Sequence, residues 1–514
     1  MSFMLAVGVD LFFSLLLGGL LYIVETGLVP SRFREKVSDI VPLFPQLKYS
    51  FLLYAVAGLL YALFSLAEVH GIPIVLLCIG IASQITRGVA KLRGEELGGL
   101  KMKKPIKRLL IGIGFVVLIL LLSSGYLVYR ISKADEVVQI KPEENTLKPG
   151  AIEIVANVGN KPYLDYLRVK AQSPIDYVVE KFKDHDVVLL GEQHEIRENC
   201  KFFSDLIEPA YRRGGVRMFI WEFLKQKRSA EVNELLTAES FDEQRIVNIF
   251  REDYLYWGFQ EYVDILRSVW VLNHSLHGGE TRLKVAGMAP DVDVFTAMCG
   301  TLWQKLPQIF TLLNAEQSYA APIEAALDRH EKALVQVGYT HTFSEYKQAR
   351  IVDGRMLGES THDRMGRLLK EKYGERVFQV SLHVRQDQVE PYTAKVTTPL
   401  IQFLETLYAE NGDTAIGFDI LNSPFALLRD TSGEYFKFQR YVTFSDIAQG
   451  YIILKPIEQL SCVKWITGFV DDSDFQHLRA YALQRKYIGE SECKSPDQLD
   501  RKFSTLLKEG RRLN

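Results

Sequence analysis

Two short apolar runs, each followed directly by Gly-x-x-His, constrain the fold of this chain more than any other feature. The run 187–190 leads into Gly191-Glu192-Gln193-His194, and the run 333–337 leads into Gly338-Tyr339-Thr340-His341. Apolar runs of this length that end in glycine are typical of buried parallel strands in α/β proteins. The residues that follow the carboxyl ends of such strands line the ligand crevice. The sequence therefore predicts a crevice that contains two histidines.

Strand-like and helix-like segments alternate from about residue 174 onward. The expected strands are 186–190, 218–221, 282–287, 333–337 and 377–382, and helical patterns lie around 197–212, 228–237, 259–273 and 356–372. This alternation favours an α/β domain, with a parallel sheet and helices on both faces. We expect the domain to cover 174–400, with 401–514 completing it and 131–173 forming a linker and entry segment.

The first 130 residues differ in composition from the rest of the chain. Long apolar stretches run approximately over 4–24, 50–68, 73–88 and 109–130, and most of them are long enough to cross roughly 30 Å of hydrocarbon. Basic residues are concentrated in 25–49 and 87–108, which places these loops in the cytoplasm and the C-terminal part outside it. We therefore expect a four-helix transmembrane region in a bacterial multi-pass inner-membrane protein. Its α/β domain would be extracytoplasmic, and the lipid bilayer would be one of its partners.

Charge and cysteine usage narrow the function only slightly. The formal net charge is −2 and the sequence pI is about 6.6, so no nucleic-acid partner is expected. Cys200, Cys299, Cys462 and Cys493 fit no zinc-binding spacing. Outside the cytoplasm these cysteines could form disulfides, but the sequence leaves their pairing open.

Polar side chains follow each of the five expected strands. In chain order they are Glu192 with His194, then Glu222, Asp291, His341 and His383. Glu222 directly follows three bulky apolar residues, where a carboxylate is costly to bury unless it is paired or hydrogen-bonded. A single histidine after a strand is more often structural than functional. Several polar residues at converging strand ends favour a functional cleft.

The segment 187–194, together with Trp221-Glu222, resembles the superfamily of erythromycin esterases, Tiki and TraB proteins and ChaN-type haem-binding proteins. Tyr256-Trp257, Glu261-Tyr262, Trp270 and Asn273 are similar to the helix before the third strand in the esterase branch. The second histidine motif also fits, with Met365-Gly366-Arg367-Leu368 after it. The resemblance covers roughly 180–385 and does not choose between the branches.

The resemblance implies that Glu192, His194, Glu222 and His341 are the catalytic residues. Esterase-like members are hydrolases in which a histidine activates water, and ChaN-like members bind haem. Tiki-like members are metal-dependent proteases with paired Gly-x-x-His motifs. A divalent metal held by His194, His341 and Glu222 is therefore one expectation, because zinc-type metals bind imidazole and carboxylate and acidify a bound water.

We expect a hydrolase that acts on an unidentified small-molecule or peptide substrate. A neutral imidazole, whose ordinary pKa is about 6.5, can take a proton from water near neutral pH. The rival expectation is a haem-binding protein, with Tyr339, Asp291 and His383 as cofactor-binding residues. A centre shared by His194 and His341 requires imidazoles no more than about 12 Å apart.

Overall fold

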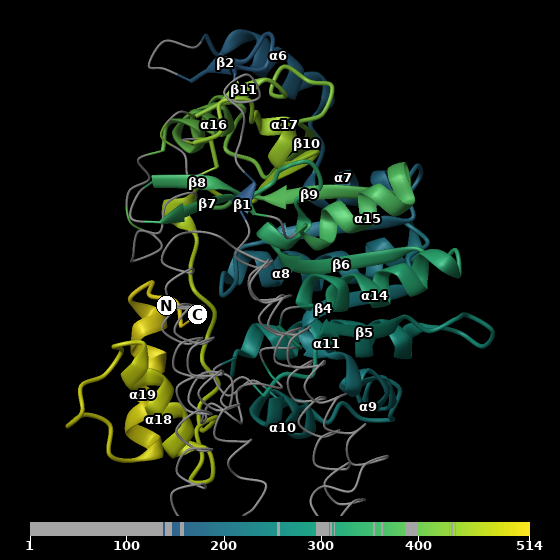
Figure 1. Cartoon of the computed structure of the whole chain (residues 1–514). Coiled ribbons are helices and arrows are strands. Elements are labelled where there is room, and N and C mark those ends of the chain that lie inside the picture. Colours follow the sequence, from purple (N-terminus) through teal and green to yellow (C-terminus); the bar gives the residue numbers. More distant parts are fainter. Residues whose placement is uncertain are drawn as a thin grey trace, which may run out of the picture. The chain divides into compact units, whose positions relative to one another are not determined.

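The computed structural model describes Val137–Val138 and residues 146–513. Gaps fall at 155–158, 254–256, 294–307, 309–310, 313, 353–354, 361–362, 386–393, 395–397, 431, 433–434 and 437. The chain divides into two units, Met1–Lys133 and Ala134–Asn514, and every described residue belongs to the second. The main feature of that unit is a seven-stranded sheet with the order β10-β12-β9-β3-β6-β4-β5 (Figure 1).

Five adjacent strands, from β9 to the edge strand β5, run parallel. They are β3 (Val187–Glu192), β4 (Met218–Lys225), β5 (Lys284–Ala289), β6 (Ala333–Gly338) and β9 (Val377–Leu382). Every residue of β3, β4, β6 and β9 is buried, which explains their nearly continuous apolar sequences. Val187 pairs in register with Ala333 and Val377, so the carboxyl ends of β3, β6 and β9 lie side by side.

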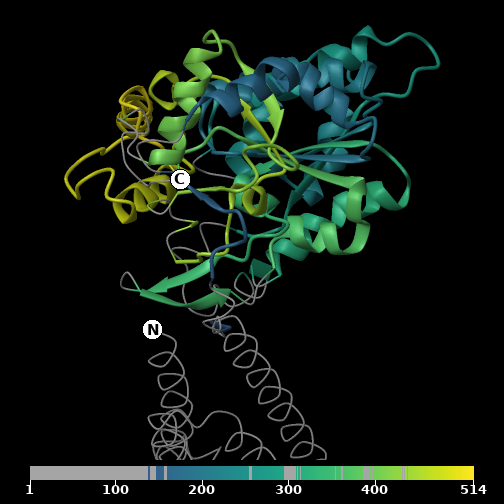
Figure 2. The same ribbon diagram turned by 90° about the horizontal axis from the view of Figure 1, so that it is seen from above.

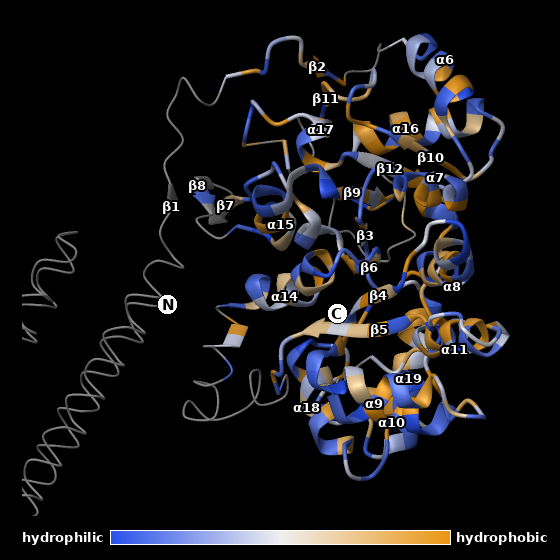
Figure 3. Ribbon diagram, turned by 90° about the vertical axis from the view of Figure 1, so that its right-hand side faces the viewer, coloured by the Kyte–Doolittle hydropathy of each residue, from blue (hydrophilic) through white to orange (hydrophobic). Residues whose placement is uncertain are grey.

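Helices cover both faces of this sheet, as Figure 3 shows. One face carries α7 (Pro174–Lys181), α8 (Arg197–Arg212) and α11 (Gln260–Ser275), and the other carries α14 (Ala315–Asp328) and α15 (Met365–Tyr373). The sequence of α8 fits its place because buried residues recur every three or four positions. They include Cys200, Phe203, Leu206, Ile207 and Ala210. Helices α9 (Ser229–Leu235) and α10 (Glu243–Asp253) extend the same core.

The expectation of a purely parallel sheet is wrong at one edge. β12 (Gly450–Ile453) runs parallel to β9, but β10 (Ile416–Asp419) pairs antiparallel with β12 and places Asp419 opposite Gly450. Among the described residues between these two strands, the helix is α17 (Phe444–Ile447), which has four residues. A parallel connection needs a longer crossover to bring the chain back to the starting end of the sheet. The sheet is therefore mixed.

Two small sheets accompany the main one. β7 (Ala349–Val352), β8 (Arg355–Ser360) and β1 (Val137–Val138) form an antiparallel sheet that stands outside the main layers (Figure 2). β2 (Ile152–Glu153) pairs with β11 (Leu428–Arg429). Beside them, α6 (Lys161–Lys170) and α16 (Pro399–Glu410) bury their apolar faces in a second core.

The second expectation that the structure does not support is the four-helix transmembrane region. Within the part of the chain that the structure describes, no helix combines the length and the apolar character needed to cross a membrane. The stretches 4–24, 50–68, 73–88 and 109–130, on which the expectation depends, lie outside the described residues. The described residues therefore give no support to the predicted transmembrane anchor or to the predicted multi-pass inner-membrane location with an extracytoplasmic domain.

The C-terminal helices pack onto the same core as α8 and α11. α18 (Phe475–Gln484) and α19 (Pro496–Lys508), yellow in Figure 1, contribute buried side chains to it, among them Phe475, Leu478, Phe503 and Leu507. The segment after β12 therefore completes the core on the α8 face of the sheet.

Candidate functional site

The carboxyl ends of β3, β6 and β4 form the base of the candidate site, and β6 lies between the other two strands. Glu192 is the last residue of β3 and Glu222 lies in β4. The middle strand ends in Gly338, where a Cβ atom would lie 2.9 Å from His194 Cε1 and 3.5 Å from Glu222 Oε2. Only glycine leaves room there, because His194 and Glu222 meet above the end of the middle strand.

Both histidines of the Gly-x-x-His motifs face Glu222. His194 Nε2 lies 3.9 Å from Glu222 Oε1, and His341 Nε2 lies 3.7 Å from the same oxygen. The structure thus brings the two imidazoles to one centre, well within the expected limit of about 12 Å. The other oxygen of this buried carboxylate, Oε2, accepts a hydrogen bond from the backbone N–H of Gly338 at 2.6 Å. That bond fixes Glu222 between the histidines.

Each imidazole is held on its other nitrogen by a separate carboxylate. His194 Nδ1 donates to Glu192 Oε1 at 2.7 Å, and His341 Nδ1 donates to the two oxygens of Glu316 at 2.9 and 3.1 Å. An ionised carboxylate only accepts hydrogen bonds, so the proton of a neutral imidazole must sit on Nδ1. The lone pair then lies on Nε2, the nitrogen that faces Glu222.

Glu316 is a site residue that the sequence did not reveal. It lies in the first turn of α14 and also accepts hydrogen bonds from Arg364 Nη1 at 2.7 Å and from the backbone N–H of Met365 at 2.9 Å. Burial alone would raise the pKa of Glu316, but His341 and Arg364 hold it below its ordinary value. Acidic residues in the first turn of a helix are common because the helix dipole favours them. No local pattern therefore marks Glu316 as a partner of His341.

The charges around His194 determine its protonation. Burial would lower the pKa of the imidazole, but the carboxylates of Glu222, Glu192 and Glu195 together raise it to about 9. His194 is therefore an imidazolium at neutral pH. The ring of Phe223 lies edge-on to it at 4.9 Å between centroids, and this apolar neighbour limits the screening of the nearby charges.

Three residues predicted for cofactor binding have partners of other kinds. The hydroxyl of Tyr339 hydrogen-bonds that of Tyr435. His383 is buried, with Nδ1 3.0 Å from the hydroxyl of Tyr451 and Nε2 3.3 Å from Glu405 Oε1. With partners on both nitrogens, His383 is not placed to be an axial ligand.

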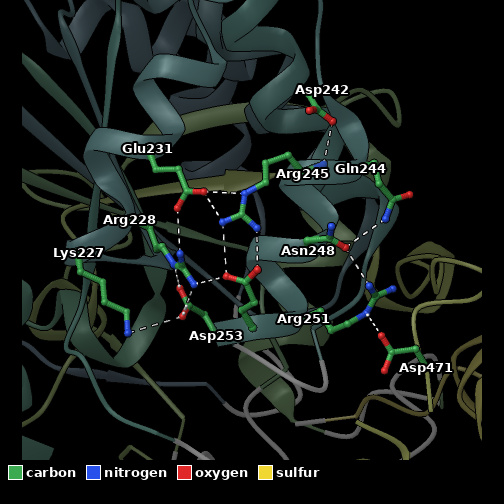
Figure 4. A network of polar contacts seen from close by, with 11 residues as sticks. Lys227, Arg228, Glu231, Asp242, Gln244, Arg245, Asn248, Arg251, Asp253 and Asp471 are labelled. Carbon is green, nitrogen blue, oxygen red and sulfur yellow. Dashed lines mark hydrogen bonds and ion pairs between the residues drawn. The ribbon is translucent and has the colours of Figure 1, made fainter. Parts of the chain in front are cut away.

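Asp291, the third of these residues, belongs to an ion-pair network at the exit of β4. Its exposed carboxylate lies 2.7 Å from Lys227 Nζ. Lys227 approaches the buried Asp253, which also accepts a hydrogen bond from Arg228 Nε at 2.9 Å. Figure 4 shows a row of ion pairs that runs from Lys227 to Asp253, then to Arg228 and then to Glu231, so that positive and negative side chains alternate. This balance of charges suits a structural link between β4, α9 and α10.

The metal site predicted at His194, His341 and Glu222 stays a prediction. In the described part of the chain, no group of three or more His, Cys, Asp and Glu side chains is arranged to hold a metal ion. Oε2 of Glu222 and both Nδ1 atoms are engaged in hydrogen bonds, so the two Nε2 atoms and Glu222 Oε1 would be left to hold an ion. The chemistry of the two histidines is derived without a metal.

No protein-family model matches the chain, and no curated protein matches it. Several solved structures resemble it weakly. An erythromycin esterase mutant in its open conformation shares 12% identity at a TM-score of 0.37, over 55% of this chain and 93% of that one. A succinoglycan biosynthesis protein shares 11% identity at a TM-score of 0.40, and the match covers 59% of this chain and 98% of that one. A Bacillus cereus protein shares 9% identity at a TM-score of 0.36, and the match covers 59% of this chain and 100% of that one. Likenesses this weak assign no activity to the chain.

Proposed function

We propose that this protein is a hydrolase in which His341 activates a water molecule and His194 acts as the acid. The observation that carries the proposal is the arrangement of the two imidazoles. Both Nε2 atoms face Glu222 Oε1, and each Nδ1 is bound to its own carboxylate. A histidine oriented by a carboxylate on one side, with a free lone pair on the other, is the usual arrangement of a general base.

The two histidines take different roles because their carboxylate surroundings differ. His194, whose pKa is raised to about 9, carries a proton at neutral pH and can donate it to a leaving group or to a developing oxyanion. His341 then takes the proton of the water. Its partner Glu316 stabilises the imidazolium that forms, as the carboxylate of a catalytic triad does. Glu222 accepts a hydrogen bond from the water between them. Esters, lactones and peptides are the substrate classes that this chemistry can cleave.

The test compares His341→Ala and Glu316→Gln with His277→Ala, which removes an exposed loop histidine. Full-length protein is assayed against chromogenic esters, lactones and peptides. We expect wild type and His277→Ala to hydrolyse one class. His341→Ala should lose roughly 10²–10⁴-fold in kcat, the usual contribution of a general base. Absence of hydrolysis in every class, or equal rates for His341→Ala and His277→Ala, would contradict the proposal.

The metal-assisted alternative predicts a different response to a chelator. The roles proposed here require that activity survives dialysis against EDTA and that the purified protein needs no added cation. Activity that disappears with EDTA and returns with Zn²⁺ or Mn²⁺ would replace these roles with a metal-bound water. A haem titration tests the binding alternative, since ligation of haem by a protein side chain shifts the Soret band.

A further inference from the structure

Glu195, the residue directly after His194, combines two energetic costs. Its φ is +67°, a left-handed conformation that is unfavourable for any residue other than glycine. Its side chain is fully buried, which is expensive for a carboxylate without hydrogen-bond donors. Glycine would remove both costs. The presence of glutamate at this position therefore points to a function of the carboxylate itself.

The donor to this carboxylate comes from the far end of the described chain. The backbone N–H of Leu513 donates to Glu195 Oε2 at 2.5 Å. Leu513 is itself fully buried in the core shared by α8, α18 and α19. Its carbonyl accepts a hydrogen bond from the hydroxyl of Tyr481 in α18. The position of the N–H donor is therefore set by the C-terminal helices.

A second set of contacts joins the same loop to the strand-like segment 461–463. The backbone N–H of Val463 donates to Glu195 O at 2.9 Å, and that of Arg197 donates to Ser461 O at 2.8 Å. Ile196 and Cys462 form an antiparallel bridge between them. The loop 193–196, between β3 and α8, is thus held on its outer side by backbone hydrogen bonds from the C-terminal segment 461–513.

We propose that Glu195 is a positioning residue that couples the His194 loop to the C-terminal segment 461–513. This inference rests on the proposed function, because it concerns the placement of the acid of that reaction. Glu195 does not touch the reacting atoms. It fixes the backbone from which His194 extends, so that Nε2 of His194 stays opposite Nε2 of His341 across Glu222. Release of the segment would free the loop and separate the acid from the base.

The test separates the carboxylate from its donor. Glu195→Gln keeps an acceptor oxygen, whereas Glu195→Gly removes it and relieves the backbone strain. Leu513→Pro removes the N–H donor, and Leu513→Ala is its matched control because it keeps the N–H. We expect Glu195→Gln and Leu513→Ala to stay within about threefold of wild-type kcat. Glu195→Gly and Leu513→Pro should lose at least about tenfold in kcat with little change in KM, since a 1 Å misplacement can cost up to about 100-fold.

Hydrogen exchange of the amides of residues 193–197 provides a readout that does not depend on activity. Faster exchange in Glu195→Gly and Leu513→Pro than in their controls, with similar thermal midpoints, supports the coupling even if no substrate is hydrolysed. In that case only the proposed function fails. Wild-type kcat and wild-type exchange in Glu195→Gly would overturn the inference, and this variant does so without depending on the folding of Leu513→Pro.

Discussion

At the scale of single residues, the site depends on the missing side chain of Gly338. A Cβ there would lie 2.9 Å from His194 Cε1 and 3.1 Å from Nε2, so Gly338→Ala must displace the imidazole. We expect a loss of at least about tenfold in kcat, because small misplacements of catalytic groups are costly. Gly278→Ala is the control, since a Cβ at Gly278 meets no atom within 4 Å. Equal rates for the two variants would show that His194 has room to move without consequence.

The protonation of His194 determines the pH dependence of the reaction. Because its pKa is about 9, we expect kcat to fall as the pH rises through this value and the acid is lost. The attraction between His194 and Glu222 is the largest single cause that raises this pKa. Glu222→Gln should therefore move the alkaline limb of the pH–rate profile to lower pH. An alkaline limb at the same pH in both proteins would show that another group is responsible.

Part of the candidate site could be predicted residue by residue from the sequence. Glu192, His194 and His341 end or follow a strand, whereas Glu222 lies inside β4, which continues to Lys225 beyond the expected end at residue 221. The parallel pairing of β3, β6 and β4 brings the four side chains together. Glu316 could not be predicted, because its contact with His341 depends on the tertiary packing that brings the first turn of α14 to the turn Tyr339–Thr342 after β6. Strand-end position does not reveal the partners of Asp291, Tyr339 and His383, which lie in other elements, and their predicted role in cofactor binding stays a prediction.

At the scale of elements, Asn273 joins α11 to the chain that enters β5. Its buried side chain donates to Leu283 O at 3.0 Å and accepts from the Leu283 N–H at 2.9 Å. Asn273→Ala leaves both backbone groups without this partner, so we expect a loss of about 2–4 kcal/mol in the free energy of unfolding. Ser268→Ala, on the same helix, removes a hydrogen bond to Asp264 O. This variant should change the free energy of unfolding by less than about 0.5 kcal/mol. Urea denaturation followed by circular dichroism measures both; similar midpoints would contradict the expected role of Asn273.

Periodicity predicted the elements of the buried layers well and those at the edges poorly. The expected strand 377–382 matches β9, and the expected helix 197–212 matches α8. The helical pattern around 356–372 was wrong in its first part, where β8 forms a strand and α15 begins only at Met365. The apolar pattern of a buried element is set by the core that it packs against, so it can be recognised in the sequence. The conformation of an edge element depends more on the strand that it pairs with. The antiparallel β10 is an edge strand of this kind.

At the scale of the whole molecule, stability should depend on the pH through His194. In the folded chain its pKa is about 9, whereas in the unfolded chain the ordinary value of about 6.5 applies. The folded state therefore binds more protons between these values, so its stability falls as the pH rises. The contribution of His194 is complete below about pH 6.5 and is lost as the pH passes through about 9. We expect the thermal midpoint of the full chain to decline over this interval, and less steeply in His194→Gln. Parallel declines in the two proteins would mean that the imidazolium does not stabilise the fold.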